Sequence, residues 1–238
     1  MRTFRARPDC PGNAARRTRV LLSLLALFAG PGAYASDTDA TATPCAKADA
    51  GYVLEDSKRA SFGSTNPVQA CIDVLSPQNE EGPRRLRIFV DGKRVISNDA
   101  VALGPDEEGA NGGPFVPLEI SHGSLIVRNA TGGGPLRVDE TWRLTNRGGQ
   151  WVVAGWDIDG SDSHSAADSG GEFHTSVNAL TGAIQDSYDP PEDDPANTKR
   201  STRHSCTLPA GWRSPPLSQI GAIRNRSWHC DPKLGKPL

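Results

Sequence analysis

Hydrophobic and polar residues alternate along much of the chain between positions 53 and 188. In residues 68–74 the apolar side chains recur at every second position, which is typical of a strand with one buried face. Runs of the same kind recur at 86–90, 93–97, 118–120, 124–127, 136–144, 151–158, 173–177 and 182–188. Turn sequences such as Asp91-Gly92 separate these runs, because glycine accepts the positive φ that a tight hairpin needs. The pattern predicts a mainly β fold, an antiparallel meander that forms a sandwich or an open barrel.

Three tryptophans, at positions 142, 151 and 156, fall within the predicted strands. Such residues usually fill a core or form cross-strand pairs, and the alternative is an exposed aromatic platform for a sugar or a peptide. Trp151 and Trp156 are separated by an odd number of positions. A regular strand would therefore place them on opposite faces, and one would be exposed unless both faces are covered.

The N-terminal residues differ from the rest of the chain. Six arginines lie within the first 19 residues, an apolar run follows at 20–29, and Ala33-Tyr34-Ala35 comes after a Gly-Pro-Gly break. These features predict a signal peptide at residues 1–35 with cleavage after Ala35. The apolar run is too short to span a bilayer, and no later segment is apolar enough. We therefore expect an exported protein, periplasmic or extracellular, with no transmembrane anchor in the mature chain.

Five cysteines are present, and Cys10 would leave with the signal peptide. An even number in an exported chain predicts two disulfides. Three pairings are open; we favour Cys45–Cys71 and Cys206–Cys230, because each closes a loop of about 25 residues. Zinc binding, with His204 and His229 as further ligands, is the alternative, but no two cysteines have the close spacing typical of zinc sites.

Composition divides the mature chain into four parts. Residues 36–50 predict a flexible leader and residues 51–188 the β-meander domain. Residues 189–198 form an acidic, proline-rich linker, and residues 199–238 a small disulfide-closed basic C-terminal module with a short helix near 217–223. Eight basic side chains and one acidic give this module a net charge of +7, whereas the rest of the mature chain carries −14.

The basic module has two interpretations. It could lie on the acidic meander, so that the two charges neutralise each other within the chain. It could instead expose a binding surface for an anionic envelope polymer or an acidic protein, and nucleic acid is not expected in this compartment. The residues of this candidate binding surface are Arg203, Arg213, Arg224, Arg226, Trp212 and Trp228.

The sequence contains no pattern that predicts a cofactor or metal site. The loop that starts at Asp157 fails the EF-hand pattern, because its sixth and twelfth positions are Asp162 and Asp168. The polar loop 159–171 raises a secreted hydrolase as one alternative, with Ser165 and His174 as nucleophile and base, although no Gly-x-Ser-x-Gly elbow exists. An inhibitor or immunity-type protein is another, with the acidic loop 106–108 blocking a basic target. We expect a non-enzymatic binding or structural protein.

Six short segments between Tyr52 and Ser187 follow one another in a recognisable order: 92–99 (GKRVISND), 112–115, 118–127 (LEISHGSLIV), 141–144, 150–157 (QWVVAGWD) and 176–182. They resemble uncharacterised exported bacterial β-meander proteins with integrin-alpha-like (FG-GAP or VCBS-type) relatives. The resemblance implies a β fold and an envelope location, and no known reaction. Relatives often carry a calcium loop before the first long strand. Here the corresponding residues 55–63 lack alternating carboxylates, so no metal site is carried over.

Overall fold

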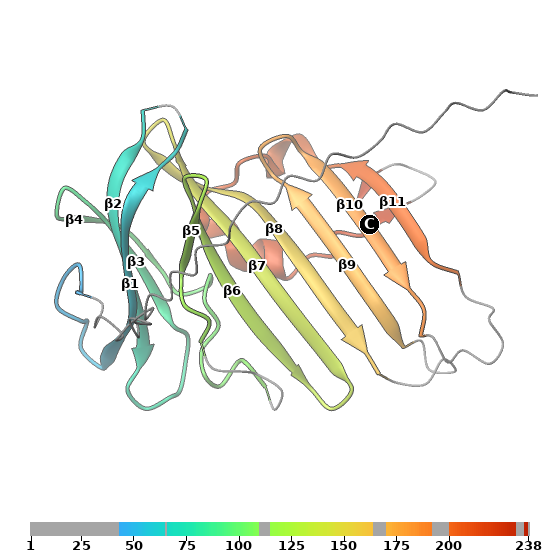
Figure 1. The fold of residues 1–238 in the computed structure, drawn as a ribbon, viewed down its shortest axis with the longest axis horizontal. Coiled ribbons are helices and arrows are strands. Elements are labelled where there is room, and N and C mark those ends of the chain that lie inside the picture. Colours follow the sequence, from blue (N-terminus) through green and yellow to red (C-terminus); the bar gives the residue numbers. More distant parts are fainter. Residues whose placement is uncertain are drawn as a thin grey trace, which may run out of the picture. The chain divides into compact units, whose positions relative to one another are not determined.

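The computed structural model describes residues 43–64, 66–109, 115–163, 170–191, 200–231 and 236–237, all within one compact unit. The first of two antiparallel sheets has four strands in chain order (Figure 1): β1 (Tyr52–Phe62), β2 (Val68–Pro77), β3 (Arg85–Val90) and β4 (Lys93–Asn98). The predicted Asp91-Gly92 turn joins the last two strands, and both of its residues have positive φ, 50° and 72°. The predicted signal peptide lies outside the described residues.

The second sheet has seven strands, whose order across the sheet also follows the chain. They are β5 (Glu119–Ser121), β6 (Ser124–Gly133), β7 (Leu136–Arg147), β8 (Gln150–Asp162), β9 (Gly171–Asn178), β10 (Ala183–Asp189) and β11 (Thr202–Thr207). Neither sheet closes into a barrel, so the predicted antiparallel β fold is confirmed in a sandwich-like form. The predicted loop 159–171 is shorter than expected, because β8 extends to Asp162 and β9 begins at Gly171.

One hydrophobic cluster joins the two sheets. Ile72, Val74 and Ile88 contribute to it from the four-stranded sheet, and Leu125 and Val127 from the seven-stranded sheet. Rings from the two sheets also meet directly, because the centroids of Phe62 and Trp151 are 5.0 Å apart. Burial of these side chains away from water is the main force that holds the sheets together.

The disulfide-closed C-terminal residues pack on this same core, as expected if the basic segment lies on the meander. β11 pairs with β10 along its whole length, from Thr202 to Thr207. After it come two 3-10 turns, η2 (Ala210–Trp212) and η3 (Leu217–Gln219), a short helix α1 (Ile220–Arg224), and a ribbon of β12 (Cys230–Asp231) and β13 (Lys236–Pro237). Leu217, Ile220, Ile223 and Trp228 are almost completely buried. A helix as short as α1 is not stable alone, so this apolar C-terminal surface is stable only when it is packed on the sheet.

A bulge in β8 changes which face its tryptophans occupy. Opposite β7, Arg143 pairs with Gly155 but Leu144 pairs with Val153, so Ala154 is an extra residue in the ladder. The extra residue shifts the alternation by one, and Trp151 and Trp156 both face the core, 6 % and 0 % exposed. The prediction that they lie on opposite faces was therefore wrong.

Four indole rings form a continuous chain through this core. Trp142 and Trp156 are cross-strand neighbours with ring centroids 6.0 Å apart. Trp228 lies 5.1 Å beyond Trp156, and Trp212 lies 5.3 Å beyond Trp228, both in edge-to-face geometry. This row of rings, which we call the tryptophan chain, runs from the buried Trp142 on β7 to Trp212, which is only partly buried. Core packing, the more frequent role for strand tryptophans, is the one observed.

Residues 43–50 are not a flexible leader. Cys45 forms a disulfide with Cys71 on β2. Asp49 makes ion pairs with Arg85 and Arg87 on β3 and with Arg94 on β4, at N···O distances of 3.0 to 3.2 Å. The low hydrophobicity of this segment predicts disorder, but charge pairing and a covalent link fix it on the sheet. Residues 36–42 lie outside the described part of the chain.

The two disulfides have the favoured pairing, Cys45–Cys71 and Cys206–Cys230. The second one ties β11 to β12, and its sulfurs belong to the core cluster. Disulfides of this kind indicate an oxidising compartment outside the cytoplasm. Among the described residues, no helix has the length and apolar character that crossing a membrane requires.

Candidate functional site

The six residues of the predicted basic surface do not lie together. Arg224 is turned inward and binds Glu140 on β7, with its Nη2 2.8 Å from Oε2. Trp228 is 2 % exposed and lies in the core. Arg203 is exposed on β11, 4.0 Å from Asp189 on β10. The intramolecular interpretation therefore holds for part of the set, and Arg213, Arg226 and Trp212 remain as candidates.

Arg226 is held against two rings of the tryptophan chain. Its guanidinium carbon lies 5.2 Å from the centroid of Trp228 and 5.6 Å from that of Trp212. Cation–π contacts use the flat face of a guanidinium and leave its N–H edge free for other partners. Arg226 is thus an exposed cation whose position is fixed before any ligand arrives.

Two further arginines meet at the same segment. The Nη1 atom of Arg147, at the end of β7, donates to the Ser214 hydroxyl at 3.4 Å. Arg213 lies along the turn at Gly182, where an added Cβ atom would approach its Nε atom to 2.7 Å. We call the surface formed by Arg147, Arg213 and Arg226 around residues 212–214 the arginine patch.

The lack of acidic partners among the described residues distinguishes this patch from most other arginines. Nine arginines of the described segments make ion pairs with carboxylates: Arg84, Arg85, Arg87, Arg94, Arg128, Arg137, Arg143, Arg203 and Arg224. Within those segments, no carboxylate lies within ion-pair distance of the three patch arginines. Their positive charge is available to a ligand, although the chain as a whole carries a net charge of −2.

The outer face of the seven-stranded sheet carries a second candidate site. Asp139, Asp159, His174, Ser187 and Arg203 are paired one after another across β7 to β11, so their side chains share one face. His174 Nδ1 lies 2.5 Å from Asp159 Oδ1. Two open cavities of about 240 and 350 Å³ adjoin this row and share His174 and Ser187.

Next to this row, Asp157 is committed to its neighbours. Burial opposes the charged carboxylate, but hydrogen bonds from Arg143 and Ser176 outweigh it and hold the pKa of Asp157 below its ordinary value. Both oxygens are thereby occupied.

The acidic loop of the inhibitor hypothesis is mostly engaged inside the protein. Glu108 binds the buried Arg84 at 2.5 Å, and Glu107 accepts a hydrogen bond from the Gly104 amide at 2.7 Å. Only Asp106 of the three acidic residues is exposed without such a contact among the described residues. Internal contacts therefore hold most of this loop in place, and two of its three acidic side chains are engaged within the protein.

The residues described here contain one group of convergent metal-ligand atoms, from Cys45, Cys71 and Asp73. Both sulfurs are joined in a disulfide, so they do not supply the thiolates that a soft metal requires. His229 lies 3.2 Å from Asp186, and its neighbour Cys230 is oxidised, which leaves no set of zinc ligands at that end of the described chain.

No protein-family model, curated protein or solved structure matches the chain. The resemblance to exported β-meander proteins with integrin-alpha-like relatives therefore stays a prediction. The candidate sites rest on the geometry alone.

Sequence reasoning missed Arg147 and Ser187. Arg147 is the last residue of a long strand and carries no motif, and only the fold brings it to Ser214 across 67 positions. Ser187 is opposite His174 through strand pairing, a relation that spacing alone does not reveal. Ser165, the predicted nucleophile, lies outside the described residues.

Proposed function

We propose that the mature chain is an exported, non-enzymatic binding protein of the cell envelope, and that its arginine patch contacts an anionic polymer. The observation that carries the proposal is the gathering, around residues 212–214, of three arginines that have no carboxylate partner among the residues the structure describes. Guanidinium groups pair well with phosphate and carboxylate, because their N–H donors match the spacing of the oxygens. Exposed donors on a negatively charged protein direct a polyanion to one place and repel it elsewhere.

The test is binding of a polyphosphate probe to the purified mature protein at low and high salt. The variant R147A/R213A/R226A removes the patch, and R94A/R128A/R137A removes the same charge from three exposed, paired arginines. At about 0.5 kcal/mol per exposed contact, the patch variant should bind about tenfold more weakly. The control variant should change affinity less than twofold, and salt should weaken binding of the unmodified protein.

Equal losses in the two triple variants would show that net charge alone is measured, and would overturn the proposal. Binding that persists at high salt would also overturn it. If an acidic protein from an envelope extract competes with polyphosphate for the patch, the partner is a protein and the polymer assignment is wrong.

Export is tested separately. We expect the protein recovered from outside the cytoplasm to begin at Ser36, as read by N-terminal sequencing. Recovery of a chain that still begins at Met1 would contradict a cleaved signal peptide.

A secreted hydrolase is the second candidate function, and the alignment of Asp159, His174 and Ser187 on neighbouring strands favours it. Asp159 would orient His174, whose Nε2 atom would take the Ser187 proton during attack on an ester carbonyl. Hydrolysis of p-nitrophenyl esters and labelling by a fluorophosphonate should be lost in S187A and H174A and kept in S165A. Turnover that is undiminished in S187A and H174A would dismiss these residues.

A further inference from the structure

The two disulfides differ in their access to solvent. Cys206 and Cys230 are 9 % and 3 % exposed and pack in the core. Cys45 and Cys71 are only half-buried, and both line an open cavity of about 360 Å³ on the four-stranded sheet. A dissolved thiol can therefore reach the Cys45–Cys71 sulfurs but meets the core around the other pair.

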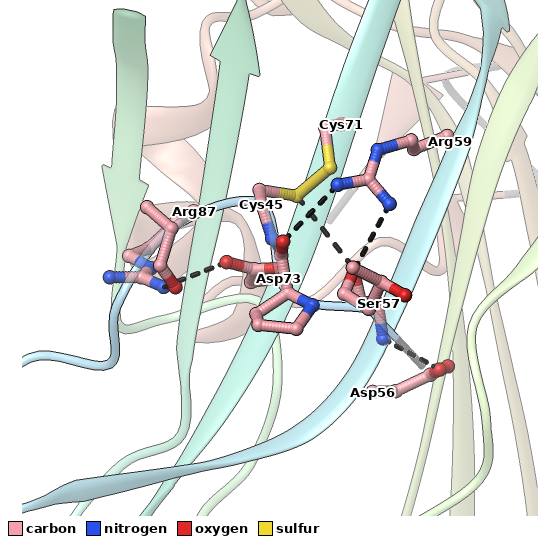
Figure 2. The surroundings of a disulfide bond; sticks show 10 residues. Cys45, Asp56, Ser57, Arg59, Cys71, Asp73 and Arg87 are labelled. Carbon is pink, nitrogen blue, oxygen red and sulfur yellow. Dashed lines mark hydrogen bonds and ion pairs between the residues drawn. A yellow bond between two sulfur atoms is a disulfide. The ribbon is translucent and has the colours of Figure 1, made fainter. Parts of the chain in front are cut away.

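Polar groups that stabilise a thiolate surround the accessible pair (Figure 2). Arg59 is paired directly opposite Cys71 in the register of β1 and β2, so their side chains are neighbours on one face. The Ser57 hydroxyl lies 3.7 Å from Cys45 Sγ. A thiolate is the leaving group when a disulfide is attacked, and a cation nearby makes it leave faster.

The nearest negative charge is already neutralised. Asp73 lies close to both sulfurs, but its Oδ2 binds the buried Arg87 at 2.7 Å and its Oδ1 accepts from the Cys45 amide at 2.9 Å. Arg59 has no carboxylate partner in the described segments. Its Nη1 and Nη2 atoms donate to the carbonyls of Thr43 and Pro44, the two residues before Cys45. These bonds hold the guanidinium over the disulfide and leave further N–H donors for a ligand.

The same cavity carries charges of both signs over an apolar floor. Arg59 and Asp91 provide the charges, and Ala70 and Phe89 the apolar part. Asp91 sits at the β3–β4 turn and has no ion-pair partner among the described residues. A small molecule with a carboxylate for Arg59 and an ammonium group for Asp91 would match this arrangement.

We propose that Cys45–Cys71 is a site of thiol–disulfide exchange for small amino-acid thiols of the cysteine class. The ligand thiolate attacks Cys45 Sγ and forms a ligand–Cys45 disulfide. The Cys45–Cys71 bond breaks, and its electron pair stays on Cys71 Sγ, opposite Arg59. The ligand sulfur is oxidised and the Cys71 sulfur is reduced, so no other oxidant or reductant is needed.

The test treats the folded mature protein with L-cysteine or with cysteamine, which differ only in the carboxylate. The reaction is stopped with an alkylating agent, and peptide mass spectrometry follows each disulfide over time, with rates expressed per thiolate present. We expect a ligand adduct on Cys45 and alkylated Cys71 while Cys206–Cys230 is still intact. One exposed ion pair should make cysteine about two- to fivefold faster than cysteamine.

Variants of one arginine complete the design. R59Q should remove the preference for cysteine, R59K should keep it, and R128Q, at an exposed arginine of the other sheet, should leave it unchanged. Circular dichroism checks that each variant is folded. Equal opening of the two disulfides, equal rates for the two thiols, or a preference that survives in R59Q would each overturn the proposal.

Discussion

Glu140 interrupts an otherwise apolar strand face, and its surroundings explain why. The carboxylate is 7 % exposed and accepts hydrogen bonds from Trp142 Nε1 at 3.0 Å and from Asn129 Nδ2 at 3.3 Å. Arg224 neutralises it and also donates to the Ala100 carbonyl at 2.5 Å. Local sequence does not reveal this partner, which is 84 positions away. A buried charge of this kind depends on every member of its network.

Replacing Arg224 by alanine should therefore be costly. R224A leaves the Glu140 carboxylate buried without a counter-charge, and we expect the free energy of unfolding to fall by about 3 kcal/mol. Urea unfolding followed by tryptophan fluorescence measures this. R128A, which breaks an exposed pair with Glu119, should change stability by less than about 1 kcal/mol. A loss below about 1 kcal/mol in R224A would show that the pair contributes little.

The pKa values of two carboxylates determine the direction in which the free energy of unfolding changes at acid pH. For Asp49, as for Asp157, burial opposes the charge, but arginine hydrogen bonds and attraction outweigh it and lower the pKa. A lowered pKa stabilises the fold fully above about pH 4, and the contribution is lost as the pH falls further. D49N and D157N should each flatten the fall in the free energy of unfolding between about pH 5 and pH 2. An unchanged slope would contradict this assignment.

At the scale of elements, local patterns predicted the strands and their turns well. Alternation and glycine turns are properties of neighbouring residues, so the strand at 93–97 and the Asp91-Gly92 turn were predicted. The bulge at Ala154 was not, because an extra residue leaves no mark in composition. For the same reason the shared face of Trp151 and Trp156 was missed.

The bulge depends on a close approach between strands. A Cβ atom at Gly155 would lie 2.4 Å from the Val177 carbonyl oxygen, which belongs to the backbone and cannot move aside cheaply. G155A should lower the free energy of unfolding by about 1 to 3 kcal/mol, measured by urea denaturation. G133A has no atom within 4 Å of the new Cβ and should have little effect. Equal effects of the two substitutions would mean that glycine flexibility, not the close approach, determines the result.

For the whole molecule, the change in charge along the chain does not coincide with a break in the packing. The basic C-terminal residues follow an acidic stretch, which suggests a separate module. Instead, Asn98 donates to the Leu217 carbonyl and Arg224 reaches Ala100, contacts that join positions 119 and 124 residues apart. Pairing at such separations is a property of the complete fold and not of any segment. Because Arg224 takes part in these contacts, it is not available to the predicted binding surface.

Deletion of residues 199–238 should therefore destroy the fold. Without β11 and the buried Leu217, Ile220, Ile223 and Trp228, the core face of the seven-stranded sheet is uncovered. We expect the truncated chain to lose its near-ultraviolet circular dichroism and its cooperative urea transition. A truncated chain that unfolds cooperatively would restore the separate module.

The tryptophan chain gives the molecule its own optical reporter. Indoles stacked this closely exchange excitation energy, so light absorbed at the buried Trp142 can be emitted from the partly exposed Trp212. Arg226 rests on that last ring, beside the place where we expect a polyanion to bind. Ligand binding would thus change the wavelength and intensity of the emission without any added dye. Fluorescence that begins in the core would therefore report binding at the surface.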